Sequence, residues 1–304
     1  MTKKLIDPAA LMRIKTLELR AKVVVEGYLA GMHRSPFHGF SVEFTEYRDY
    51  SPGDDTRHLD WKLYARSDRM YIKRYEDETN LRCWFLVDQS KSMGFQSRGY
   101  TKAEYAATLA ATLAQFLYSQ GDAVGLMAFD ADITQYLPAR NRPGHLRHIM
   151  LELEKAPGGT STDLERPLRR MADMLNKRGL VVLISDLLTD ITSLQKQLGY
   201  LRSRGHEVIV FQILDPAERD LDFSTPAMFE DLETGENLLV DPDAARATYQ
   251  ENLQSHLDQI GETCRGLGID HHAFGTERPL ERALQEFVLD RSRRRAMPMR
   301  GTRA

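Results

Sequence analysis

The hydrophobic positions of this chain follow two different periods. Apolar residues run almost without interruption through four short segments, as they do in strands that are buried on both faces, at residues 81–87, 122–129, 180–184 and 208–214. The intervening segments carry apolar side chains at helical spacing, at residues 101–119, 143–153, 164–177 and 190–203. Repeated strand–helix units of this kind predict an α/β fold with a doubly wound, mainly parallel sheet.

The first 80 residues show a different pattern. A helix is predicted over 8–30, and turn residues and an alternating segment at 40–44, typical of a half-buried strand, follow it. A short helix over 57–67 and a strand over 69–75 complete this region. We therefore expect a small α+β module at 1–80, followed by the α/β domain at 81–290.

Two features modify the C-terminal third. A hairpin insertion is predicted at about 227–240, with its turn at Thr234-Gly235, and Asp241-Pro242 then begins a long helix. The last segment, 291–304, contains six arginines and no acidic residue. We expect this tail to be disordered and solvated, with contact to nucleic acid or to an acidic partner as the alternative.

Composition narrows the class of protein. The net charge is −3 with both signs mixed, so no general affinity for nucleic acid is expected. The longest apolar runs are too short to span a membrane, and the N-terminus has no apolar signal core. The two cysteines, Cys83 and Cys264, lie in apolar patterns and are predicted to be buried free thiols. These features favour a reduced, cytoplasmic protein.

The candidate chemistry lies after the buried strands. In an open parallel sheet, ligands bind beyond the carboxyl ends of the strands. Asp88, Ser90 and Ser92 follow the first strand, Asp186 follows the third, and a polar Gly-Gly-Thr-Ser-Thr-Asp loop covers 158–163. Carboxylate and hydroxyl oxygens suit Mg²⁺ or Mn²⁺ and not zinc. The sequence therefore predicts a site for one of these two ions.

These motifs resemble the metal-ion-dependent adhesion site of von Willebrand factor A domains. The resemblance is carried by Asp88-Gln-Ser90-Lys-Ser92, Gly159-Thr160, Ile184-Ser-Asp186 and the strand Gly121–Phe129. It implies that Ser90, Ser92 and Thr160 contact the metal, with Asp88 and Asp186 binding directly or through water. Asp163 is an alternative ligand to Thr160. Leu187 follows Asp186 where many relatives have glycine.

A second motif resembles a bacterial family. Residues 44–61, Phe-Thr-Glu-Tyr-Arg-Asp-Tyr-Ser-Pro-Gly-Asp-Asp-Thr-Arg-His-Leu-Asp-Trp, are similar to the signature of the DUF58 family. The resemblance implies a non-catalytic adaptor that binds an acidic residue of a partner and works with a MoxR-type AAA+ ATPase. This motif forms either a salt-bridged packing turn or a partner-docking surface. The residues of that surface would be Arg48, Asp54, Asp55, Arg57, Asp60 and Trp61.

Enzymatic readings have weaker support in the sequence. The chain has neither a phosphate-binding loop with Gly-Lys-Ser/Thr nor a Gly-x-Ser-x-Gly nucleophile elbow. A Mg²⁺-dependent phosphatase with Asp88 as nucleophile is the best enzyme alternative, although Ser90 cannot replace a carboxylate general acid. A degenerate, metal-free scaffold is another alternative. His271 and His272 point to opposite faces of a predicted strand, so we expect them to be structural.

Overall fold

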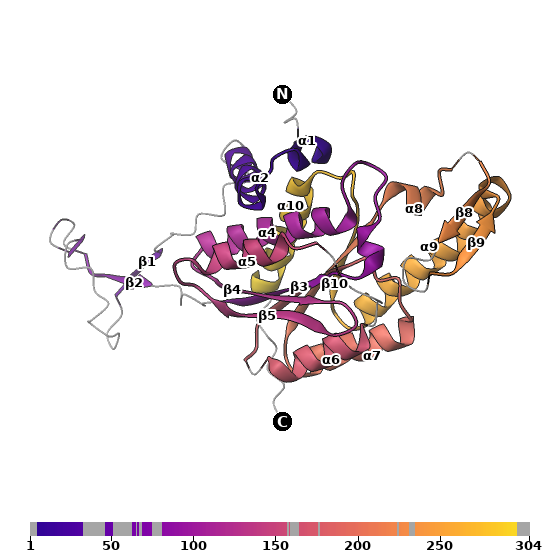
Figure 1. The fold of residues 1–304 in the computed structure, drawn as a ribbon. Coiled ribbons are helices and arrows are strands. Elements are labelled where there is room, and N and C mark those ends of the chain that lie inside the picture. Colours follow the sequence, from indigo (N-terminus) through magenta and orange to yellow (C-terminus); the bar gives the residue numbers. More distant parts are fainter. Residues whose placement is uncertain are drawn as a thin grey trace. The chain divides into compact units, whose positions relative to one another are not determined.

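A computed structural model describes most of the chain (Figure 1). The described residues are 5–32, 46–50, 63–64, 66, 69–74, 81–156, 158, 164–175, 177–223, 225–230 and 235–296. In this part of the chain, no helix has the length and apolar character that a membrane crossing requires.

The chain forms two compact units whose boundary differs from the one expected at residue 80. One unit comprises residues 1–31 together with 81–304, and the other comprises 32–80. The N-terminal helices α1 (Pro8–Met12) and α2 (Leu17–Met32) belong to the larger unit because their apolar side chains, including Leu11, Leu17 and Val24, are buried in its core. The described part of the smaller unit contains an antiparallel pair, β1 (Glu46–Asp49) and β2 (Tyr71–Arg74).

The larger unit is built on a six-stranded sheet with the order β10-β7-β6-β3-β4-β5. All neighbouring strands are parallel except β4 and β5, which are antiparallel. The strands are β3 (Arg82–Asp88), β4 (Ala123–Phe129), β5 (Ile133–Arg140), β6 (Leu180–Ser185), β7 (Glu207–Leu214) and β10 (Asp270–Gly275). The doubly wound, mainly parallel sheet predicted from the sequence is confirmed.

Helices cover both faces of this sheet, as Figure 1 shows. One face packs on α4 (Lys102–Ser119), α5 (His145–Leu153), α10 (Leu280–Ala296), α1 and α2. The other face packs on α6 (Glu165–Met174), α7 (Ile191–Ser203) and α9 (Pro242–Gly266). Alternate residues of β3 enter the two cores, with Phe85 in the first and Leu86 in the second. The uninterrupted apolar strands therefore follow from burial on both faces.

Both cysteines are buried free thiols, as predicted. Cys83 lies on β3 in the first core and Cys264 lies on α9 in the second, and neither is exposed. Burial raises the pKa of both thiols, that of Cys264 to about 11. They are therefore protonated at neutral pH and poorly nucleophilic.

The hairpin insertion is confirmed as the antiparallel pair β8 (Ala227–Glu230) and β9 (Asn237–Val240), which precedes α9. Asp241 caps α9 by accepting a hydrogen bond from the Asp243 backbone N–H at 3.1 Å.

The tail begins later than predicted, because α10 continues to Ala296. Arginine is a favourable helix residue, and Arg291 lies 3.3 Å from Asp122 and over the ring of Phe287. Residues 297–304 lie outside the described part of the chain.

The adjacent histidines of β10 point to opposite faces and make different structural contacts, as expected. His271 lies 3.1 Å from the Gln212 side chain, and burial lowers its pKa to about 4. His272 lies 2.6 Å from Asp290 and 3.0 Å from Glu286, both on α10. Burial lowers the pKa of His272. Its hydrogen bond to Asp290 and the charges of both carboxylates raise the pKa by more than burial lowers it, so the net shift is upward.

We expect the two histidines to give stability opposite pH dependences. The raised pKa of His272 means that its contribution is present below the ordinary histidine pKa and is lost as the pH rises through the folded value. Thermal unfolding of His272→Gln should therefore show a larger loss at about pH 5.5 than at about pH 8.5, on either side of the ordinary value of about 6.5. His271→Gln should show a smaller loss at the lower pH, because neutral burial of His271 is unfavourable there. Equal losses at both pH values for His272→Gln would contradict the ion-pair assignment.

Candidate metal centre

The candidate site lies where the strand order of the sheet reverses. From β3 the chain winds outward through β4 and β5, and it then returns to β6 on the other side of β3 before continuing to β7 and β10. Because β3 and β6 are parallel neighbours, their carboxyl ends meet at one edge. Asp88 ends β3, and Ser185 ends β6 directly before Asp186. Ligands of open α/β sheets bind at such a position.

Asp88 is fully buried and held in place by two hydrogen bonds. One carboxylate oxygen accepts from the backbone N–H of Ser90 at 2.9 Å, and the other accepts from the Ser185 hydroxyl at 2.5 Å. Burial and then the negative charge of Asp186 raise the pKa of Asp88 to about 7, although the bonds from Ser185 and Ser90 act in the opposite direction. The site thus contains two carboxylates close enough to repel each other, an arrangement that a cation would stabilise.

Two serine hydroxyls follow Asp88 in the same loop. Ser90 is buried and precedes the short 3-10 helix η2 (Lys91–Gly94), so the turn of η2 brings its Oγ to 3.0 Å from the Oγ of Ser92. Neighbouring oxygens around an octahedral Mg²⁺, each about 2.1 Å from the ion, are separated by about 3 Å. The spacing of the hydroxyls therefore fits a pair of adjacent ligands to such an ion.

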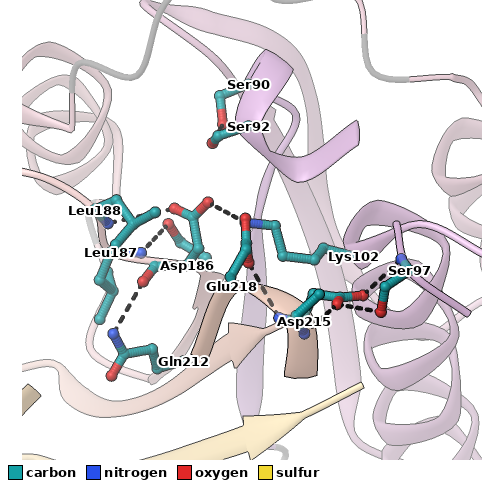
Figure 2. A network of polar contacts seen from close by, with 12 residues as sticks. Ser90, Ser92, Ser97, Lys102, Asp186, Leu187, Leu188, Gln212, Asp215 and Glu218 are labelled. Atoms are coloured by element: carbon teal, nitrogen blue, oxygen red, sulfur yellow. Dashed lines mark hydrogen bonds and ion pairs between the residues drawn. The ribbon is translucent and has the colours of Figure 1, made fainter. Parts of the chain in front are cut away.

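Asp186 is also fully buried, and it contacts a positive charge that the sequence did not reveal (Figure 2). The ammonium group of Lys102, the first residue of α4, lies 2.8 Å from Asp186 and 2.7 Å from Glu218. Glu218 lies on α8 (Pro216–Asp220), which follows β7. Figure 2 shows this ion-pair network below the Ser90 and Ser92 hydroxyls. Asp186, a predicted metal ligand, is thus already paired with an internal cation.

Further polar residues support this arrangement. Gln212 on β7 donates to the backbone oxygen of Asp186 at 2.9 Å. Asp215 caps α8 and accepts hydrogen bonds from the backbone and hydroxyl of Ser97. Asp215 directly follows the buried strand β7. The expectation that ligands bind beyond the carboxyl ends of the strands, which identified Asp88 and Asp186, therefore applied to Asp215 as well. Lys102 gave no comparable signal, since a lysine at a helix start is ordinarily solvent-exposed.

The backbone after Asp186 takes a conformation that glycine adopts most easily. Leu187 has a φ of 56° and is fully buried in the second core. Its N–H donates to the Ser185 hydroxyl at 3.1 Å. The left-handed region costs a non-glycine residue roughly 1–2 kcal/mol, which burial of the leucine side chain offsets. The chain therefore keeps a turn suited to glycine despite the leucine.

Several predicted site residues lie outside the described part of the chain. These include Thr160 and the alternative ligand Asp163, as well as Asp54, Asp55, Arg57, Asp60 and Trp61. Arg48 is described only through its backbone, which pairs with Ile72 in the β1–β2 ladder. Of the predicted metal ligands, the structure places Asp88 against Ser90 and Ser90 against Ser92, and the charge of Asp186 acts on Asp88. Asp186 does not cap the next helix, because Asp190 caps α7.

A hollow of about 240 Å³ adjoins the loop that follows β3. Its lining includes Gln89, which lies between Asp88 and Ser90, and Gly158, which precedes the segment containing Thr160. Asp130, Glu152 and Lys155 also line it. The hollow is large enough to admit a side chain beside the loop.

The described residues fit a hard divalent ion better than a softer one. Among them, no three His, Cys, Asp or Glu side chains gather closely enough to hold a metal. The oxygen donors at this edge are the hydroxyls of Ser90 and Ser92 and the carboxylates of Asp88 and Asp186. Oxygen donors of this kind suit Mg²⁺ or Mn²⁺.

Comparison with solved structures gives distant similarities. The chain is 15% identical to an aerotolerance-related membrane protein from Bacteroides fragilis, with a TM-score of 0.49, and the match covers 69% of this chain and 99% of the other. The chain is 12% identical to the SpRpn10 VWA domain, with a TM-score of 0.41, and the match covers 68% of this chain and 95% of the other. A mussel byssus protein, proximal thread matrix protein 1, solved with a zinc-occupied MIDAS motif, matches at 15% identity and a TM-score of 0.35, covering 44% and 38%.

Sequence comparison gives a more extensive match. The uncharacterized protein Rv1480 of Mycobacterium tuberculosis is 29% identical over 293 residues, which cover 94% of this chain and 91% of that protein. The family model described as "Protein of unknown function DUF58" matches residues 46–259, more than half of the chain. The chain therefore belongs to the DUF58 family.

Proposed function

We propose that this protein is a non-catalytic adaptor that binds an acidic residue of a partner protein through a Mg²⁺ or Mn²⁺ ion. The observation that carries the proposal is the 3.0 Å pair of Ser90 and Ser92 hydroxyls beside the buried carboxylates Asp88 and Asp186. Ser90 and Ser92 would contact the ion, together with Thr160. The two aspartates would orient the ligands or bind through water.

The ligand set explains why the partner would supply a carboxylate. Hydroxyl oxygens are neutral and do not cancel the charge of a divalent ion, so the bound metal would keep an affinity for an anionic oxygen. An Asp or Glu side chain is the protein group that provides such an oxygen.

The environment of Asp88 supports binding rather than catalysis. A phosphatase nucleophile needs a carboxylate oxygen that can reach the substrate phosphorus. Asp88 is fully buried, and each of its oxygens accepts a hydrogen bond, one from Ser90 and one from Ser185. These bonds are suited to a carboxylate that positions its neighbours.

Membership of the DUF58 family supports a particular class of partner. The genes of this family typically accompany MoxR-type AAA+ ATPases. We therefore propose that the adaptor acts with such an ATPase in a chaperone-like or complex-assembly role, with the acidic residue on the ATPase or on its client.

A metal-free scaffold is the second candidate, and one observation favours it. Lys102 already provides Asp186 with a positive charge at 2.8 Å, so the fold has a cation at this edge without any metal. The two candidates differ in a single measurable property, which is saturable binding of a divalent ion.

We expect calorimetric titration of Mg²⁺ and Mn²⁺ into chelator-treated protein to show saturable binding to one site. Ser90→Ala/Ser92→Ala should abolish it, because the substitution removes two of the contacting oxygens. Ser119→Ala/Ser203→Ala, two hydroxyls in the last turns of α4 and α7, which lead into the amino ends of β4 and β7, is the matched control and should bind like the wild type. Absence of binding in the wild type would favour the metal-free scaffold.

Asp88→Ala should weaken metal binding without unfolding the protein. It leaves the Ser90 N–H and the Ser185 hydroxyl without an acceptor, a loss of about 1–3 kcal/mol, but it also removes the repulsion from Asp186. We expect a folded protein by circular dichroism whose metal affinity is lower by at least about 10–100-fold and which no longer captures its cognate ATPase in a Mg²⁺-dependent pulldown. Asp173→Ala, which changes a half-exposed carboxylate on α6, is the control. Mg²⁺-dependent capture by Asp88→Ala would contradict the proposal.

A further inference from the structure

Lys102 lies in an environment that lysine rarely occupies. Its side chain is completely buried, and its ammonium group contacts two carboxylates, Asp186 at 2.8 Å and Glu218 at 2.7 Å. Asp186 is equally buried, whereas 18% of the Glu218 side chain is exposed. Burying a lysine is unfavourable unless its charge is paired, so the two carboxylates determine where the ammonium lies.

The two partners of Lys102 differ in their other contacts. Asp186 belongs to the candidate metal site, and its charge acts on Asp88 across that site. Glu218 is fixed from outside the site: its second oxygen accepts from the Asp215 N–H at 3.1 Å, and its backbone oxygen accepts from the Tyr249 hydroxyl at 2.7 Å. Glu218 can therefore keep Lys102 in place when the charge near Asp186 changes.

A divalent ion at Ser90 and Ser92 would compete with Lys102 for the same carboxylate. Positive charges repel strongly in a poorly solvated interior. The ammonium on Asp186 would thus oppose metal binding, and the metal would weaken the Lys102–Asp186 pair. Charges that compete for one carboxylate are linked reciprocally, in the same way as two ligands.

We infer that Lys102 is an internal cation that neutralises Asp186 in the metal-free protein and that metal binding leaves its ammonium group paired with Glu218 alone. This inference rests on the proposed metal site and adds a residue that sets its affinity. It also connects the site to α8, because Glu218 lies on that helix and Tyr249 joins α8 to α9. Occupancy of the site would then change the charge balance at α8.

The test is a double-mutant cycle on the full-length chain, with Mn²⁺ affinity measured by calorimetry. Lys102→Met should tighten Mn²⁺ binding by about 5–150-fold, the usual range for coupled ligands. Glu218→Gln should weaken it, because Lys102 is left with Asp186 alone. In the Lys102→Met background, Glu218→Gln should have a much smaller effect. Arg291→Met breaks a largely buried ion pair with Asp122, away from the site, and should leave Mn²⁺ affinity unchanged.

The cycle gives an answer even if one variant is unstable. Lys102→Met leaves two carboxylates without their cation, so the comparison of Glu218→Gln with Lys102→Met/Glu218→Gln serves as a second measurement of the same effect. Tighter binding after removal of Lys102 supports the inference in either background. An unchanged or weaker affinity overturns it while the metal site stands.

Two other outcomes separate the inference from the proposed function. Equal effects of Glu218→Gln on Mn²⁺ affinity with and without Lys102 would mean that Glu218 acts on the metal by itself, which overturns the role of Glu218 in holding Lys102. Absence of Mn²⁺ binding in every variant would overturn both the metal site and the competition. The first of these results leaves the adaptor function standing, and the second does not.

Discussion

The structure depends on the burial of negative charge at the carboxyl edge of its sheet. Asp88 and Asp186 follow adjacent parallel strands, so the topology places two fully buried carboxylates close together. Such groups are unfavourable unless hydrogen bonds and positive charge compensate them. Ser185 and the Ser90 backbone supply hydrogen bonds to Asp88, and Lys102 supplies the charge for Asp186.

This requirement joins segments that are far apart in the sequence. Lys102 begins the helix after β3, and Glu218 lies 116 residues later on α8. Asp215 caps α8 and also holds the loop before α4 through Ser97. The two halves of the doubly wound sheet therefore meet in one polar network. A change of charge at the site would act on both halves.

The sequence predicted the sheet because strands buried on both faces require continuous apolar residues, as in residues 180–184. It predicted Asp88 and Asp186 because the carboxyl ends of parallel strands share an edge. It could not predict the pairing of Lys102 with Asp186, since no local pattern records a contact between such distant residues. The N-terminal boundary was misplaced for a related reason: α1 and α2 pack on a core formed by residues beyond position 80.

The central claim is that a divalent ion binds at the Ser90 and Ser92 hydroxyls. A crystal structure of the protein soaked in Mn²⁺, with anomalous diffraction recorded, tests it most directly. The account predicts one strong anomalous peak about 2.1–2.2 Å from both Oγ atoms, a typical length for bonds from a small divalent ion to oxygen. An anomalous map without a peak between the two serines, with Lys102 still paired to Asp186, would contradict it.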